Sequence, residues 1–145
     1  MTRMQQADAP DAALIAAYKA THYEVHAPEG LLVLQIDVPN ARLRTVHENE
    51  RVHCSAFLTA WNPRSVPTPP AQNAAALDRM RARIAALGLA MWPGWGHDPG
   101  GTWPAEESLF VPGLELEPAT RLARDFDQHA IVHVAGDAIP RLILL

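Results

Sequence analysis

This chain of 145 residues has a single cysteine and no long hydrophobic run. Cys54 is its only cysteine, which excludes an internal disulfide and a cysteine-based zinc site. It stands in the strand-like run HCSAFLTA, so we expect a small core residue rather than a reactive thiol. No stretch approaches the ~20 apolar residues that span a bilayer, and the start, MTRMQQADAPDAA, lacks the apolar middle of a signal peptide. The sequence therefore predicts a cytoplasmic protein with no membrane partner.

An excess of positive charge is also absent. The chain has 12 Lys and Arg against 16 Asp and Glu, a formal net charge of −4, whereas a generic nucleic-acid binder needs basic residues to neutralise phosphates. We therefore expect no nucleic-acid partner, and Arg79, Arg81 and Arg83 are interpreted as a solvated helix face. What is present, 48% hydrophobic and 19% charged residues, is typical of a globular chain. The length fits one domain, 1–145, in which residues 1–10 form a flexible N-terminus.

Hydrophobic periodicity and turn residues predict an alternation of helices and strands. The expected elements are a short helix from residue 11, strands at 23–25, 30–39, 53–61, 89–92 and 107–116, helices at 71–88 and 117–127, and a closing hairpin around Gly136-Asp137. Segment 40–50 fits either a helix capped by Asn40 or a hairpin strand. The Gly- and Pro-rich segment 93–106 is predicted to be a loop.

The order of these elements predicts the fold class. From residue 53 the order is strand, helix, strand, strand, helix, strand, which is the split βαβ or ferredoxin-like plan. Its right-handed crossovers give a sheet order of 4-1-3-2 with the helices on one face. The N-terminal strands and the C-terminal hairpin extend that core. We therefore expect an α+β protein with a mixed, mostly antiparallel sheet.

This topology brings three unusual segments to one edge of the sheet. Loop 62–72, loop 93–106 and the turn at 127–129 all follow or precede strands at the same end. Loops carried by a rigid scaffold are where binding and catalysis usually occur. The prolines of the first loop, at 63, 67, 69 and 70, restrict its backbone, which either lowers the ordering cost of binding or keeps a long loop from fraying.

The residue types along that edge fit a small polar or anionic ligand, such as a nucleotide. Arg64 and Ser65 are candidate anion contacts, because a guanidinium binds carboxylate or phosphate in a bidentate manner. Asn73 serves either as a helix cap or as a ligand contact, and the tryptophans either stack on a ligand or hold their loops to the core. The candidate ligand-binding residues are Asn62, Arg64, Ser65, Asn73, Trp61, Trp95, Gly96, Trp103, Ser108 and Gln128.

Two neighbouring carboxylates are candidates for acid–base chemistry. Glu107 is the candidate catalytic residue, since a carboxylate at a crowded site edge can act as a general base. An ion pair between Glu107 and Arg64 is the alternative. Strand alternation leaves open whether Glu106, Glu107 or Ser108 faces the site. Histidines and acids in this region lack the spacing of metal ligands, so no metal site is predicted, and any cofactor is unknown.

Four pieces of the chain occur together in a specific combination. They are FLTAWNPRS, Asn73 in the following helix, GWGHDPGGTWPAEESLFV, and Phe126-x-Gln128 with Ala130. This combination resembles the signature of a bacterial family catalogued as domain of unknown function 3293, most closely over residues 57–130. In that family a glycine commonly precedes the glutamine, where this chain has Asp127. The resemblance implies a small intracellular bacterial protein and brings no activity, cofactor or catalytic residue with it.

Three functions are compatible with such an edge. The favoured one is binding of a small polar or anionic ligand. A protein-interaction surface that uses the tryptophans is the second. The third is a hydrolase in which Glu107 acts as acid or base on a glycosidic or phosphoester bond. A concave polar pocket favours the first and third, and a flat tryptophan-rich patch favours the second.

Overall fold

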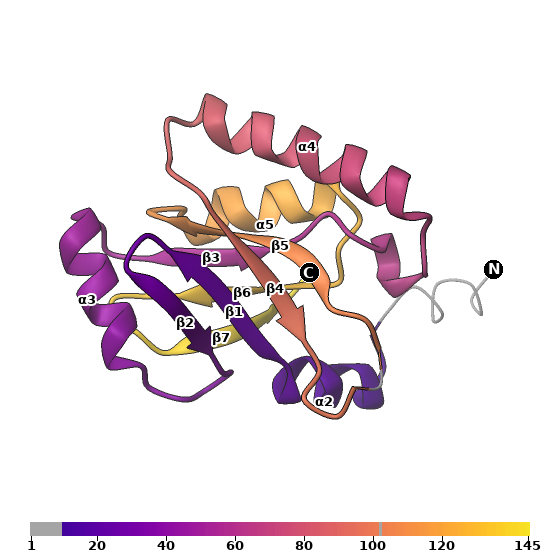
Figure 1. Ribbon diagram of the computed structural model, residues 1–145, viewed down its shortest axis with the longest axis horizontal. Coiled ribbons are helices and arrows are strands. Elements are labelled where there is room, and N and C mark those ends of the chain that lie inside the picture. The colour runs from indigo at the N-terminus through magenta and orange to yellow at the C-terminus, as the bar shows by residue number, and fades with distance from the viewer. Residues whose placement is uncertain (1–9, 102) are drawn as a thin grey trace.

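The computed structural model describes residues 10–101 and 103–145, and within them it shows one curled sheet of seven strands with four α-helices (Figure 1). The elements are α2 (Ala12–Ala20), β1 (His22–Ala27), β2 (Gly30–Leu34), α3 (Ala41–Glu50), β3 (Ser55–Leu58), the 3-10 helix η1 (Pro63–Ser65), α4 (Pro70–Ala86), β4 (Trp92–His97), β5 (Glu106–Pro112), α5 (Leu116–Asp125), β6 (Ala130–Val134) and β7 (Pro140–Leu144). The predicted α+β class is confirmed. The predicted flexible N-terminus falls almost entirely on residues 1–9, which lie outside the described residues.

The strands follow the order β2-β1-β4-β5-β3-β6-β7. The four strands from β3 onward therefore lie as β4-β5-β3-β6, which is the 4-1-3-2 order expected from the sequence. The hairpins β1–β2 and β6–β7 extend this core at its two edges, as predicted. Every pairing is antiparallel, so the expectation of a mixed sheet was wrong. The strands β3 and β4 do not pair, because β5 lies between them.

Helices cover both faces of the sheet, whereas the sequence analysis placed them on one. The long helix α4 and α5 lie over one face (Figure 1), where Leu77, Met80 and Leu122 pack in one apolar cluster. Helix α3 contributes Leu43 and Val46 to a second cluster on the opposite face. The sheet has a second apolar face, which includes Val25 and Phe110, and an apolar face must be buried against another element. No helix in the described segments is both long and apolar enough to cross a membrane.

The open question about segment 40–50 is answered by α3. The side chain of Asn40 accepts hydrogen bonds from the backbone N–H groups of Arg42 and Leu43, at 3.0 and 3.2 Å, and so caps the helix. His47 is buried on the inner side, where its Nε2 lies 2.9 Å from Ser55 Oγ. A cap and a buried inner stripe are the requirements of a short surface helix, and the hairpin alternative is wrong.

The largest error concerns β4. Residues 92–97 form a strand in the middle of the sheet, although PGWGH was predicted to begin a loop and the strand was expected at 89–92. The reason is close packing: a Cβ at Gly94 would lie 2.6 Å from the carbonyl oxygen of Glu24 and 2.7 Å from Cε2 of Phe57. A glycine inside a strand often marks such a close approach. The strand predicted at 53–61 is also shorter and covers only Ser55–Leu58.

Candidate functional site

A cleft of about 510 Å³ opens at the end of the sheet where the three unusual segments meet. Figure 1 shows that η1, the start of α4, α2 and the connection from β4 to β5 gather at this end. The volume falls in the range of small-molecule sites, which is about 300–1,000 Å³. The predicted contacts that line the cleft are Trp61, Asn62, Ser65, Asn73, Gly96, Trp103, Ser108 and Gln128. Three other candidates, Arg64, Trp95 and Glu107, are not among its lining residues.

Asn62 and Asn73 form the polar centre of one wall. The backbone N–H of Asn62 donates to Asn73 Oδ1 at 2.9 Å, and Asn73 Nδ2 donates to Asn62 Oδ1 at 3.0 Å. Thr68 completes the cluster, because its N–H donates to Asn62 Oδ1 and its carbonyl oxygen accepts from Asn73 Nδ2. Asn73 is only 1% exposed. Since the N-cap of α4 is Pro69, with no side-chain bond, Asn73 holds the loop instead of capping the helix.

Glu106 is the carboxyl that faces the cleft. In the sheet it lies opposite Gly96, which in turn lies opposite Tyr23, and directly paired residues point to the same face. Asn62 Nδ2 donates to Glu106 Oε2 at 2.7 Å. Burial raises the pKa of Glu106 above its usual value, and the hydrogen bond from Asn62 offsets part of that rise. The missing side chain of Gly96 leaves space beside this carboxyl.

Glu107 and Trp95 lie opposite each other in the β4–β5 ladder, on the other face of the sheet from Glu106. Arg81 of α4 binds Glu107 there, with Nη2 2.9 Å from Oε2. The alternative pairing with Arg64 is therefore wrong. Strand alternation places the two adjacent carboxyls, those of Glu106 and Glu107, on opposite faces of the sheet. The sequence did not indicate which of the two faces the cleft.

A chain of hydrogen bonds joins α2 to the loop. Tyr18 Oη lies 2.9 Å from Ser65 Oγ, which lies 3.3 Å from His129 Nδ1. Burial raises the pKa of the Tyr18 phenol, the Ser65 hydrogen bond lowers it, and the charge of Glu106 raises it further. The hydroxyl of Tyr23 donates to the Tyr18 carbonyl at 2.6 Å. Sequence reasoning missed both tyrosines, because the local patterns of α2 and β1 do not indicate where these side chains lie relative to the three loops.

Left-handed backbone is concentrated around the first loop. Asn62, Arg64 and Ser65 have φ of 46°, 57° and 59°, a region that costs non-glycine residues about 1–2 kcal/mol each. Asp127 has φ of 56°, so it keeps the conformation that a glycine would adopt most easily. The two turns are joined directly, since Arg64 N–H donates to the Asp127 carbonyl at 2.8 Å. The side chains of Arg64 and Asp127 approach to 3.9 Å at the exposed rim.

Gln128 and the tryptophans complete the walls. Gln128 Nε2 donates to the carbonyl oxygens of Trp61 and Phe126, at 3.1 and 3.4 Å, and thereby ties the 127–129 turn to the first loop. Trp61 is partly buried against the α4–α5 cluster, and its Nε1 is buried without a hydrogen-bond partner in the described part of the chain. Trp103 is 38% exposed and lies at the rim. Trp61 and Trp103 therefore line a hollow, and with Trp95 on the other face of the sheet the tryptophans do not form one flat patch.

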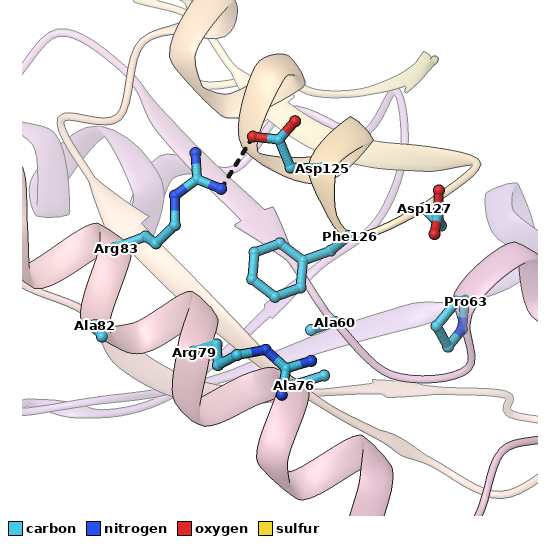
Figure 2. A pocket seen from close by; sticks show the side chains of 9 residues that line it. All are labelled: Ala60, Pro63, Ala76, Arg79, Ala82, Arg83, Asp125, Phe126 and Asp127. Atoms are coloured by element: carbon cyan, nitrogen blue, oxygen red, sulfur yellow. Dashed lines mark ion pairs between the residues drawn. The ribbon is translucent and has the colours of Figure 1, made fainter.

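A second hollow, which we call the groove, lies between α4 and the C-terminal end of α5. It has a volume of about 530 Å³ and a floor that includes Ala60, Ala76 and Phe126. Figure 2 shows Arg83 reaching from α4 to Asp125, and the two side chains form an ion pair of 2.9 Å. Both are about half exposed. The described chain brings no three His, Cys, Asp or Glu side chains together as metal ligands.

The chain belongs to the family described as protein of unknown function (DUF3293), whose model matches residues 58–131, just over half of the chain. This confirms the resemblance seen in the sequence. No curated protein and no solved structure matches the chain. The matched segment begins in β3 and ends in β6, so it contains the loop, Glu106 and Gln128, while α2 with Tyr18 lies outside it.

Proposed function

We propose that this protein binds a small polar molecule in the cleft. The observation that carries the proposal is the convergence of polar side chains from distant segments on one partly apolar hollow. Tyr18 comes from α2, Asn62 and Ser65 from the first loop, Glu106 from β5 and Gln128 from the last turn. Apolar walls with a few converging polar groups are typical of small-molecule sites.

The contacts narrow the class of ligand. The expectation of an anion depended on Arg64, which does not line the cleft and whose exposed guanidinium lies 3.9 Å from the Asp127 carboxylate. Of the lining residues that the structure describes, none is Lys or Arg, and Glu106 is acidic. An anion would meet this carboxyl with no opposing charge. We therefore favour a neutral or cationic ligand. It would resemble a nucleotide in having a ring with polar edges, but not in carrying a phosphate.

A hydrolase remains the second proposal, with Glu106 in the role first given to Glu107. A half-buried carboxyl with a raised pKa suits a general acid. Against it, most glycosidases use two carboxyls, about 5–10 Å apart, and in the described residues Glu106 is the single carboxyl that lines the cleft. A protein-interaction role has less support, because Trp61 lines a hollow and Trp95 lies on the opposite face.

Three further expectations belong to this proposal. The strand order β4-β5-β3-β6, with α4 and α5 on one face, supports a ferredoxin-like core. The family resemblance supports a bacterial source. The absence of an excess of basic residues and the resemblance together support a cytoplasmic protein without nucleic-acid partners.

A fragment screen tests the binding proposal. A library of small neutral, cationic and anionic fragments is added to ¹⁵N-labelled protein, and chemical-shift changes are mapped onto the backbone. We expect the changes to cluster at Tyr18, Asn62, Gly96 and Gln128. Changes that cluster around Phe126 in the groove, or nowhere, would contradict the proposal.

A filled cleft is the matched control. A Cβ at Gly96 would meet a single neighbour within 4 Å, Thr21 Cγ2 at 3.9 Å, so Gly96→Leu places its side chain in the open space beside Glu106. We expect the variant to remain folded and to lose the fragment response. Retention of the same shifts in Gly96→Leu would show that fragments bind elsewhere.

A further inference from the structure

Aromatic side chains and a single carboxyl share the cleft. The aromatic lining residues are Tyr18, Tyr23, Phe57, Trp61 and Trp103. They come from different parts of the chain, namely α2, β1, β3 and the two loops. The faces of aromatic rings carry negative electrostatic potential and attract cations, most strongly for tryptophan and in desolvated sites. A carboxylate attracts the same group through its full charge.

We propose that the ligand of the cleft carries a cationic nitrogen, a primary or quaternary ammonium, which is held by Glu106 and the aromatic walls. This inference rests on the proposed function, since it names the chemistry of the molecule that the cleft binds. It replaces the anionic ligand expected from the sequence with one of the opposite charge.

The first argument is that Glu106 has no opposing charge. Within the described residues its carboxyl bonds one side chain, the neutral amide of Asn62 at 2.7 Å, and forms no ion pair. By contrast, Glu107 on the other face is bound by Arg81. A carboxylate withdrawn from water without a partner is unfavourable, and a bound ammonium supplies the missing positive charge.

The second argument is that the Glu106 carboxyl and the aromatic rings border the same part of the cleft. Besides burial, which is the larger cause for both, the negative charge of Glu106 raises the pKa values of the Tyr18 and Tyr23 hydroxyls. Tyr18, Tyr23 and Glu106 all line the same cleft. Gly96 lies between Tyr23 and Glu106 in the sheet and has no side chain to fill the gap. An ammonium seated there would lie between the carboxyl and aromatic lining residues.

Matched probes separate charge from shape. Choline and 3,3-dimethylbutan-1-ol have nearly the same form, but a quaternary nitrogen in the first is a carbon in the second. Dissociation constants are measured by titration of the backbone chemical shifts at Gly96 and Gln128. We expect choline to bind at least about tenfold more tightly than the neutral alcohol. Equal affinity, or binding of neither probe at these positions, would overturn the inference.

The adjacent glutamates supply a charge-matched control. In Glu106→Gln the carboxyl is lost while the amide oxygen can still accept from Asn62, so the wall stays intact. We expect the preference for choline to fall about tenfold in Glu106→Gln and to stay unchanged in Glu107→Gln. Both variants change the net charge equally, so an equal loss in both would reduce the effect to general electrostatics and overturn the inference. Thermal unfolding confirms that each variant is folded.

A pH series provides a readout that does not depend on a variant. Choline keeps its charge at every pH, so weaker binding at acidic pH reports protonation of groups on the protein. The titratable groups at the cleft are Glu106, Tyr18, Tyr23 and, through Ser65, His129. We expect choline affinity to fall as Glu106 takes up its proton, and to lose that dependence in Glu106→Gln. An unchanged pH profile in the variant would assign the effect to His129 and contradict the role of Glu106.

The outcome also separates this inference from the proposed function. If fragments bind in the cleft but show no preference for cations, the inference is wrong and the binding function stands. If no fragment of any charge perturbs the cleft, both are wrong.

Discussion

The cleft and the groove have nearly the same volume, about 510 and 530 Å³, but they are built differently. The groove lies between two helices over an apolar floor, and its charges, such as those of Arg83 and Asp125, are half exposed. The cleft has a buried Asn73 in its wall and a carboxyl with a raised pKa. Volume alone therefore does not distinguish a binding site from a gap between helices.

The cleft and the groove differ in how much hydrogen bonding and backbone strain the fold needs to form them. Exposed ion pairs cost little and contribute little, typically up to about 1 kcal/mol. Buried polar groups require partners, and the cleft wall meets that need with reciprocal hydrogen bonds between Asn62 and Asn73. Two residues of that wall, Asn62 and Ser65, also have left-handed backbone. Strain of this kind is often found at functional sites, and it supports the proposal that the cleft is the binding site.

The largest predicted effect is the loss of the Asn73 side chain. Asn73→Ala leaves the Asn62 N–H and the Thr68 carbonyl without their partners. Each buried polar group left unsatisfied costs about 1–3 kcal/mol, so we expect the free energy of unfolding to fall by about 2–4 kcal/mol in chemical denaturation. The neighbouring exposed Gln72→Ala is the control and is expected to change it little. A loss of unfolding free energy below about 0.5 kcal/mol in Asn73→Ala would mean that the hydrogen bonds of the cleft wall stabilise the fold no more than the exposed ion pairs of the groove do.

The two glycines of β4 test whether the cleft is space that the fold leaves open. Gly94→Ala forces a Cβ against the Glu24 carbonyl oxygen and the Phe57 ring, at 2.6 and 2.7 Å, and overpacking of this kind costs about 1–3 kcal/mol. Gly96→Ala has room, so we expect a stability within about 0.5 kcal/mol of wild type. Thermal and denaturant unfolding of both variants measure the contrast. A comparable loss at Gly96 would show that the cleft is narrower than described.

A smaller, pH-dependent effect is expected at Glu106. Because burial raises its pKa above the ordinary 4.5, the folded protein holds this proton more tightly than the unfolded chain does. The resulting contribution to stability is complete below that ordinary value and is lost as pH rises through the raised pKa. We therefore expect Glu106→Gln to gain stability relative to wild type as pH rises from the ordinary pKa of 4.5 through the raised pKa of Glu106.

Denaturant unfolding at a series of pH values measures this difference, and Glu107→Gln reports the loss of a carboxylate outside the cleft. A difference between Glu106→Gln and wild type that shrinks as pH rises would contradict the assigned direction.

The sequence predicted the elements that depend on local chemistry. The helices predicted from residue 11 and at 71–88 correspond to α2 and α4. Asp11 caps α2 by accepting from the Leu14 N–H at 2.8 Å, and α4 buries a stripe that contains Leu77, Met80 and Ile84. Topology then placed Ser65 and Gln128 at one end of the sheet. These predictions succeeded because capping and helical periodicity act within a few residues of the chain.

The errors have long-range causes. The segment of β4 from Pro93 onward was predicted to be a loop, because Gly94 serves a close approach to Glu24 and Phe57, which are far away in the chain. Glu107 was preferred over Glu106 because the direction of strand alternation depends on which face a helix covers. Tyr18 was missed because the docking position of α2 is set by tertiary contacts, such as the bond between its hydroxyl and Ser65. None of these is readable from a local pattern.

The smallest effect is expected in the groove and completes the comparison. Arg83→Ala removes an exposed ion pair with Asp125, which contributes about 0–1 kcal/mol in comparable cases. A double-mutant cycle with Asp125→Ala, measured by urea unfolding, isolates the coupling between the two side chains. We expect a coupling below about 1 kcal/mol that decreases further at high salt. A coupling above about 2 kcal/mol would place the groove in the same class as the cleft wall, because only a desolvated and well-ordered pair reaches that size. In that case Phe126 and the two arginines of α4 that line the groove, Arg79 and Arg83, would merit the same search for a ligand as Glu106 and its aromatic neighbours.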